Sequence, residues 1–281
     1  MSILNHKIDF ALVFSVSHAN PNGDPLNGNR PRETYEGYGE VSDVCLKRKI
    51  RNRLMDLGAP VFVQSDDRCQ DGFKSLKDRA DSIPELKKCK DSSVYAQTAC
   101  KTWLDVRSFG QVFAFKGDDA SVGVRGPVSI HPAFSVSPIE INSLQITKSV
   151  NSITGPKKSS DTMGMKHRVN FGLYTTFGSI NCQLAEKTGF SQEDADLIKQ
   201  ALLTLFENDS SSARPDGSME VVRLYWWEHN CKSGQYSSAK VHRSLHMKAL
   251  CDTPHHINDY SITCDTLDGL LPKVYDVYNE S

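Results

Sequence analysis

The sequence predicts a mixed α+β fold in which strands alternate with two clear helices. Residues 7–17 predict a central strand, because apolar residues recur at every second position, namely Ile8, Phe10, Leu12, Phe14 and Val16. A helical spacing of apolar residues follows Ser42, and a second one follows Ser191. With the later strand patterns, this order is compatible with a ferredoxin-like βαββαβ core that carries two insertions.

Composition excludes several classes of protein. The chain has 281 residues, of which 38% are apolar and 24% charged, as is usual for a globular domain. Its apolar runs are far shorter than the roughly 20 residues that cross a bilayer, and the N-terminus lacks a signal-peptide pattern. No two of the eight cysteines form a Cys-x-x-Cys pair, which favours free thiols. We therefore expect a cytoplasmic protein that does not contact a membrane.

The first helix presents a stripe of cations. Residues 18–32, which precede it, are rich in Asn, Gly, Pro and Asp and predict a structured loop. Ser42 is the expected N-cap, and Gly58 ends the helix. Lys47, Arg48 and Arg51 lie off the apolar stripe of Leu46, Ile50, Leu54 and Leu57. We therefore expect this helix to bury its apolar side and to direct its cations outward.

Two insertions interrupt the core. Residues 59–104 are dense in both charges and predict a partly helical subdomain. Strand patterns return at 111–115 and 122–150, and 151–164 then loses alternation around a Gly-Pro-Lys-Lys-Ser-Ser run. A projection between two strands is the simplest account of that segment.

The second half returns to regular patterns. Residues 167–177 alternate, with one face polar, basic and aromatic, which suggests a nucleic-acid platform. Ser191 caps the second helix, with Glu193 and Asp194 in its first turn, and residues 219–227 form a final strand.

Charge is local rather than global. Lys and Arg number 33 against 34 Asp and Glu, giving a formal net charge of −1. Cations gather in residues 47–53 and 145–170, whereas acids dominate the last thirty residues. Such separation allows one face to hold a polyanion. Because no catalytic or metal-binding motif is recognisable, an enzyme is disfavoured, and no metal or cofactor is expected.

Several groups of residues occur in the order found in one known family. They are the loop Asn20-Pro21-Asn22-Gly23-Asp24-Pro25 with Gly28 and Arg30, the segment Asp105-Val106-Arg107 with Phe109 and Gly110, the run Gly126-Pro127-Val128, and Met163-Gly164-Met165-Lys166-His167 with Val169, Gly172 and Tyr174. In these motifs the chain resembles the CRISPR-associated backbone subunit of type I Cascade, most like the type I-C branch, within the RAMP superfamily. The similarity runs from about residue 7 to about residue 227.

The resemblance implies a domain organisation. It implies an RRM-like palm with a finger-like insertion and a thumb hairpin. The expected segments are 1–58 for the first part of the palm, 59–110 for the finger, 111–147 for palm strands, 148–164 for the thumb hairpin, and 165–281 for the rest of the palm and the C-terminal region.

The resemblance also implies a function without catalysis. Copies of the chain would polymerise as a helical filament along a CRISPR RNA (crRNA), without sequence preference, and present it for pairing with target DNA in antiviral defence. The other expected partners are the subunit that processes the crRNA and holds its 5′ end, the large subunit and the small subunit.

Residues are assigned to this role by their place in the motifs. The resemblance implies that the palm loop contacts RNA, that the first helix contacts phosphates, and that thumb residues reach over the RNA. The implied RNA-binding residues are Asn20, Asn22, Arg30, Lys47, Arg51, Arg107, Lys157, Lys158, Met163, Met165, Lys166, His167 and Arg168.

Two alternatives stay open at this point. Related RAMP subunits cut RNA with a loop aspartate, and Asp24 and Asp161 are the acids that such a role would use here. The second alternative is an unrelated α+β protein that binds a small ligand.

Overall fold

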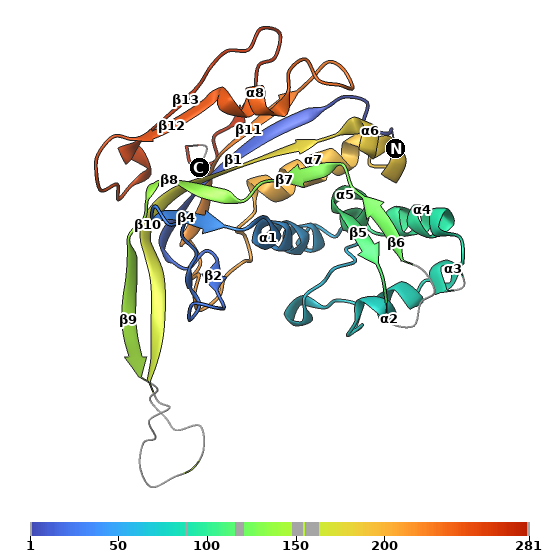
Figure 1. Ribbon diagram of the computed structural model, residues 1–281, viewed down its shortest axis with the longest axis horizontal. Helices are drawn as coiled ribbons and strands as arrows, with labels where there is room; N and C mark the ends of the chain where they lie inside the picture. Colours follow the sequence, from blue (N-terminus) through green and yellow to red (C-terminus); the bar gives the residue numbers. More distant parts are fainter. Residues whose placement is uncertain (1, 88, 116–120, 148–153, 155–162, 280–281) are drawn as a thin grey trace.

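The computed structural model is organised around one large antiparallel sheet (Figure 1). It describes residues 2–87, 89–115, 121–147, 154 and 163–279. The strands follow the order β14 (Lys273–Tyr275), β11 (Met219–Glu228), β1 (Ile8–Ala19), β10 (Met163–Ile180), β8 (Ala133–Pro138) and β4 (Tyr38–Val41). β7 (Val128–Ile130) and β9 (Ile141–Thr147) also pair with β10. The predicted mixed α+β class is therefore confirmed.

Strand β1 lies in the middle of the sheet because both of its faces are apolar. It runs antiparallel to β10 on one side and to β11 on the other. Phe10 and Phe14 face one apolar cluster, and Ala11 and Val13 face another. A strand with two buried faces needs a covering layer on each side, and the remaining elements supply both layers.

The first layer consists of helices. In α1 (Asp43–Asp56), the Ser42 hydroxyl accepts a hydrogen bond from the Cys45 amide at 3.2 Å, which caps the helix as predicted. In α7 (Gln192–Leu203), Ser191 and Asp194 form a reciprocal capping box. The apolar stripes of both helices meet β1 in one fully buried cluster. The short α6 (Cys182–Thr188) joins β10 to α7.

The C-terminal part of the chain forms the opposite layer (Figure 1). It contains α8 (Ser238–Arg243), β12 (Leu245–Ala249), a 3-10 turn at Ile257–Asp259 and β13 (Tyr260–Cys264). β12 and β13 form a two-stranded sheet of their own. Leu245 and Tyr260 pack with Trp227 in the second apolar cluster. This layer explains why alternate residues of β1 and β11 are apolar on the face away from the helices.

The insertion after α1 is a small subdomain with an apolar cluster of its own. Its elements are a 3-10 turn at Asp66–Arg68, α2 (Leu76–Asp81), α3 (Pro84–Lys87), α4 (Ser92–Thr102), α5 (Leu104–Phe109), β5 (Gly110–Phe113) and β6 (Val122–Arg125). Phe62, Trp103 and Phe113 pack at its centre with their ring planes tilted. The predicted partly helical insertion is present.

One expected boundary is corrected by the pairing of the strands. Residues from 111 were expected to belong to the main sheet, but in the described part of the chain β5 pairs with β6 alone, and the main sheet resumes at β7. A close backbone approach makes this separation possible. A Cβ atom at Gly126 would lie 2.2 Å from the Ser108 carbonyl oxygen, so only glycine allows β6 to return beside α5.

Within the described ranges, no helix combines the length and the apolar character needed to cross a membrane. All eight cysteines are free thiols, as their spacing predicts.

Candidate nucleic-acid interface

A two-stranded hairpin projects from the main sheet (Figure 1). β9 pairs with the first part of β10, from Met163 opposite Thr147 to Val169 opposite Ile141. The paired arms therefore begin at Ile141, before the expected thumb of residues 148–164. Most of that segment, including Lys157, Lys158 and Asp161, lies outside the described residues.

Strand alternation divides the hairpin side chains between two faces. We call one face the inner face; it carries Ser143, Gln145, Met163, Met165 and His167. Two contacts confirm that these residues share a side: Gln145 Nε2 donates to Met163 Sδ at 3.0 Å, and His167 Nδ1 lies 2.8 Å from Ser143 Oγ. The opposite, outer face carries Leu144, Ile146, Lys166 and Arg168. The implied thumb-base residues therefore do not form one surface.

Arg30 connects the inner face to the early loop. This loop is closed by β2 (Gly23–Asp24) and β3 (Arg30–Pro31). Arg30 Nη1 donates to Ser143 Oγ at 2.9 Å, so Ser143 joins the arginine to His167. The bridge spans 113 residues of sequence and holds the loop against the base of the hairpin. The early loop and the base of the hairpin therefore lie against each other, with the Arg30 cation at their contact.

Above this bridge, the inner face is open and apolar. The side chains of Met163 and Met165 are 62% and 55% exposed. Large apolar side chains that stay exposed on a projecting strand are available to a ligand. The thioethers of Met163 and Met165 can pack against the faces of unstacked bases, and the nearby Arg30 can bind phosphates.

Asn20 and Asn22 hold the loop in place from inside. The Asn20 amide donates from Nδ2 to the Asn29 carbonyl at 2.7 Å, and its side chain is buried. Asn22 Oδ1 accepts from both the backbone amide and the hydroxyl of Ser42, each at 2.9 Å. Asn22 therefore fastens the loop to the cap of α1. Direct contact of either asparagine with RNA stays a prediction.

The cations of α1 differ in what they contact. Lys47 pairs with Asp43 one turn earlier at 3.0 Å, on the surface. Arg51 instead donates from Nε to Asp105 Oδ2 at 2.9 Å, and Arg48 donates to the Val63 carbonyl. The Arg51 side chain is only 13% exposed. The expectation that Arg51 points outward is therefore corrected, because a buried carboxylate of the insertion draws it inward.

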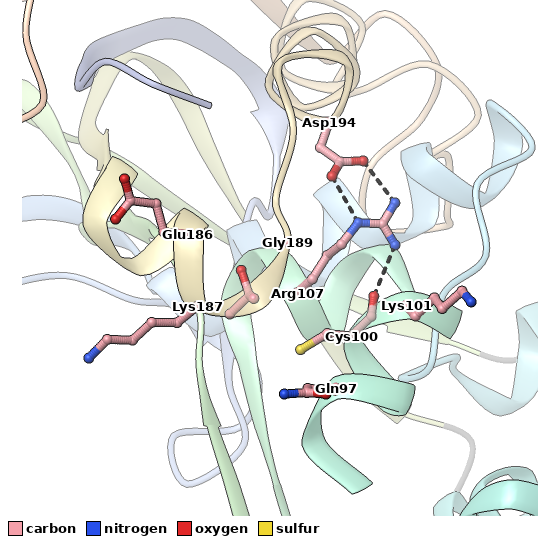
Figure 2. Close-up of a pocket in the computed structure, with 9 residues that line it drawn as sticks. Gln97, Cys100, Lys101, Arg107, Glu186, Lys187, Gly189 and Asp194 are labelled. Atoms are coloured by element: carbon pink, nitrogen blue, oxygen red, sulfur yellow. Dashed lines mark hydrogen bonds and ion pairs between the residues drawn. The ribbon is translucent and has the colours of Figure 1, made fainter. Parts of the chain in front are cut away.

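Arg107 makes a similar internal contact. Its Nε and Nη2 atoms each donate to Asp194 at 2.8 Å, and Nη1 donates to the Cys100 carbonyl at 3.2 Å (Figure 2). Because Asp194 belongs to the cap of α7, this bidentate pair joins the insertion to the helix layer. In this structure Arg107 holds the insertion against the helix layer. That Arg107 binds RNA remains a prediction.

Of the two acids suggested for cleavage, Asp161 lies outside the described residues, and Asp24 is engaged. Asp24 Oδ1 accepts from the Leu26 amide at 3.2 Å and lies 3.5 Å from Arg32 Nη2.

Two important residues were missed by sequence reasoning. Ser143 has no motif that marks it, whereas Asp105 stands in the segment beside Arg107 and was noticed only as part of that segment.

Comparisons with known proteins agree with one another. Residues 6–265 match the family model described as CRISPR-associated protein Cas7. A Haloferax volcanii protein described as "CRISPR-associated protein Cas7" is 26% identical over 243 residues, which are 80% of this chain and 70% of the relative. A chain in a solved "CRISPR RNA-guided surveillance complex, pre-nicking" superposes with a TM-score of 0.51 at 16% identity, covering 79% of this chain and 75% of that one. That structural similarity shows a shared fold.

Proposed function

This chain belongs to the CRISPR-associated Cas7 family, and from that premise we propose that it is a crRNA-binding backbone subunit of an RNA-guided surveillance complex. The observation that carries the proposal is the contact between the early loop and the inner face of the hairpin, which places Arg30 on the same face as Met163 and Met165. Arg30, which Ser143 holds in place, is the expected contact with phosphates. The exposed Met163 and Met165 are the expected contacts with bases. These are the groups that binding of a single strand without sequence preference requires.

The finer parts of the proposal concern the complex. We propose a type I-C assembly in which copies of the chain polymerise along the crRNA and present it to target DNA, beside a processing, a large and a small subunit. An open row of copies uses two different surfaces of each chain, so the length of the RNA sets the number of copies. If each copy neutralises about five phosphates, the log–log salt slope is roughly −3.5 per copy. The near-neutral net charge is compatible with stacked copies.

We also propose that the core follows the ferredoxin-like βαββαβ plan. The order β11, β1, β10 and then β7 or β8, with α1 and α7 in the same apolar cluster, supports this topology. A non-catalytic role is part of the proposal. The hydrogen bond and ion pair that engage Asp24 support it, because a carboxylate that fixes its own loop is not free to act on RNA.

Co-expression tests this function. The chain is produced with a CRISPR array and the processing subunit, purified, and examined by absorbance at 260 and 280 nm and by native mass. We expect a multi-copy particle that contains RNA of one defined length. A monomer free of nucleic acid at low salt, despite confirmed guide production, would contradict the proposal and favour a small-ligand protein.

To test for cleavage, the particle is incubated with complementary RNA and Mg²⁺. Cutting that Asp24→Ala abolishes would contradict the non-catalytic role.

A further inference from the structure

A cleft lies between the insertion and α6, and the crRNA contacts proposed for Arg30, Met163 and Met165 do not use it (Figure 2). Its cavity is about 500 Å³, with α4 on one wall and α6 on the other. The paired Arg107 and Asp194 also line it. A second hollow of about 220 Å³, lined by Arg125 and the start of α6, shares Lys187 with the first. The two hollows thus adjoin along α6; together we call them the α6 cleft.

The α6 cleft carries a net positive charge. Among its lining residues, Asp194 is neutralised by Arg107, and Glu186 forms an ion pair with Lys232. The three remaining cations are exposed, and no acid within the described ranges pairs with them; they are Lys101, Arg125 and Lys187. Three unneutralised cations around one cleft favour an anionic ligand.

The positions of the helices do not account for this charge. Lys101 and Lys187 lie in the last turns of α4 and α6, where a cation interacts favourably with the helix dipole. A helix C-terminus offers only about half of an elementary charge, which leaves about half of the charge of each lysine unbalanced. Arg125 ends strand β6 and lines the second hollow with the N-terminal end of α6, which is the positive end of the helix dipole and cannot balance its charge.

The shape of the α6 cleft selects the kind of anion. The lysine side chains extend from its two sides in opposite directions, and the amide of Gln97 lies between them (Figure 2). The cations come from three separate elements and line two adjoining hollows, an arrangement that suits an extended anion better than a small one. A chain of phosphates can contact cations placed one after another, and amides serve its sugars and phosphates.

We propose that the α6 cleft binds the backbone of a second single-stranded polynucleotide, in addition to the guide. The inference rests on the proposed function, since it takes the hairpin as the guide-binding element. The hairpin and α6 lie at opposite ends of the sheet (Figure 1), so one chain could hold two strands apart. Because no aromatic side chain lines the described part of the cleft, we expect recognition without base stacking and without sequence preference.

The test uses the assembled particle and a labelled dT20 oligonucleotide that cannot pair with the guide. The variant carries Lys101→Ala, Arg125→Ala and Lys187→Ala, and the matched control carries Lys74→Ala, Arg243→Ala and Lys248→Ala, which are exposed cations outside the cleft. Affinity for dT20 is measured between 50 and 200 mM salt. Each lost phosphate contact lowers the magnitude of the log–log slope by about 0.7, so the cleft variant should lose about 2 in slope per site. The control should bind as wild type does.

Guide content separates the two proposals. Both triple variants should retain guide RNA of unchanged length, measured by absorbance ratio and gel. If wild-type particles hold no RNA, the proposed function fails. If the guide is retained but the cleft variant binds dT20 with the wild-type slope, or the control loses as much, the α6-cleft inference is overturned. An acidic decapeptide that binds the cleft while dT20 does not would also overturn it.

Discussion

Asp105 accepts a hydrogen bond from Arg51 Nε at 2.9 Å inside the contact between the insertion and α1. The carboxylate has no exposed surface. It also accepts from the backbone amides of Phe62 and Val63, at 2.7 and 3.1 Å. One buried carboxylate thus fixes both the start of the insertion and a cation of the helix layer. With Arg107 on Asp194, it gives the Asp105-Val106-Arg107 segment two anchors to the core.

Removing this carboxylate should destabilise the whole fold. We expect Asp105→Ala to lower the free energy of unfolding by about 3 kcal/mol, because one buried amide, one partly buried amide and one guanidinium lose their acceptor. Urea unfolding followed by tryptophan fluorescence measures it. Asp43→Ala is the matched control, since its pair with Lys47 is a surface contact one helical turn long and should cost less than about 0.5 kcal/mol. Equal losses in the two variants would contradict the role assigned to Asp105.

The two cations Lys47 and Arg51 should separate binding from folding. Lys47→Glu leaves the core intact, so we expect the stability of wild type. RNA should bind more weakly, and the magnitude of the log–log salt slope of RNA binding should fall by about 0.7. Arg51→Glu places a second carboxylate against Asp105, and we expect it to unfold in less urea than wild type does. Urea midpoints and co-purified RNA are measured for both variants. A Lys47→Glu variant with unchanged RNA content would remove that residue from the interface.

Stability should depend on pH through a buried cluster beneath α8. Asp9 Oδ2 lies 2.9 Å from His229 Nε2 and 3.0 Å from Lys7 Nζ, and Asp9 Oδ1 lies 3.7 Å from His242 Nε2. Burial alone raises the pKa of Asp9, but hydrogen bonds from His229, Ser238 and Lys7 outweigh it and hold the pKa below 3.8. Burial lowers the pKa of His242 below 6.5, more than the nearby Asp9 raises it. His131 also faces His242, with ring centroids 5.7 Å apart.

These two shifts act in separate pH windows. As pH falls through 6.5, the unfolded chain protonates His242 before the folded chain does, so stability falls in that window. The contribution of Asp9 is present above pH 3.8 and is lost only as pH falls further, through its lower folded value. We expect His242→Gln to flatten the loss of stability between pH 6.5 and 5, measured by urea unfolding at each pH. The same slope in both proteins would contradict this origin.

Regular periodicity made the core of the fold predictable from the sequence. The strand at 7–17 and the helices after Ser42 and Ser191 are long, and each encodes its buried face locally. The C-terminal layer was not predicted, because β12 and β13 have five residues each, too few to show a period. The separate pairing of β5 with β6 depends on the close approach of Gly126 to the Ser108 backbone, and no local sequence pattern predicts that approach.

The candidate site was predictable in part, for a related reason. Sequence placed Arg51 correctly off the apolar stripe of α1, but its partner Asp105 lies 54 residues away, so the pattern could not show that the cation is engaged. Sequence also grouped Met163 to Arg168 as one surface. Strand alternation divides that group, and which half meets the early loop is fixed only by the contact from Arg30 to Ser143.

That division gives a prediction about the two faces of the hairpin. If crRNA lies on the inner face, Met163→Ala with Met165→Ala should weaken RNA binding about tenfold, the order expected for loss of thioether contacts with a base. The salt slope should not change, because no charge is removed. Lys166→Ala with Arg168→Ala removes two cations from the outer face and should leave RNA retention unchanged. Filter binding of a labelled guide at several salt concentrations measures affinity and slope together. Because both methionines are more than half exposed, the melting temperature should stay near that of wild type. Loss of guide from the outer-face variant alone would place the RNA on the other side of the hairpin.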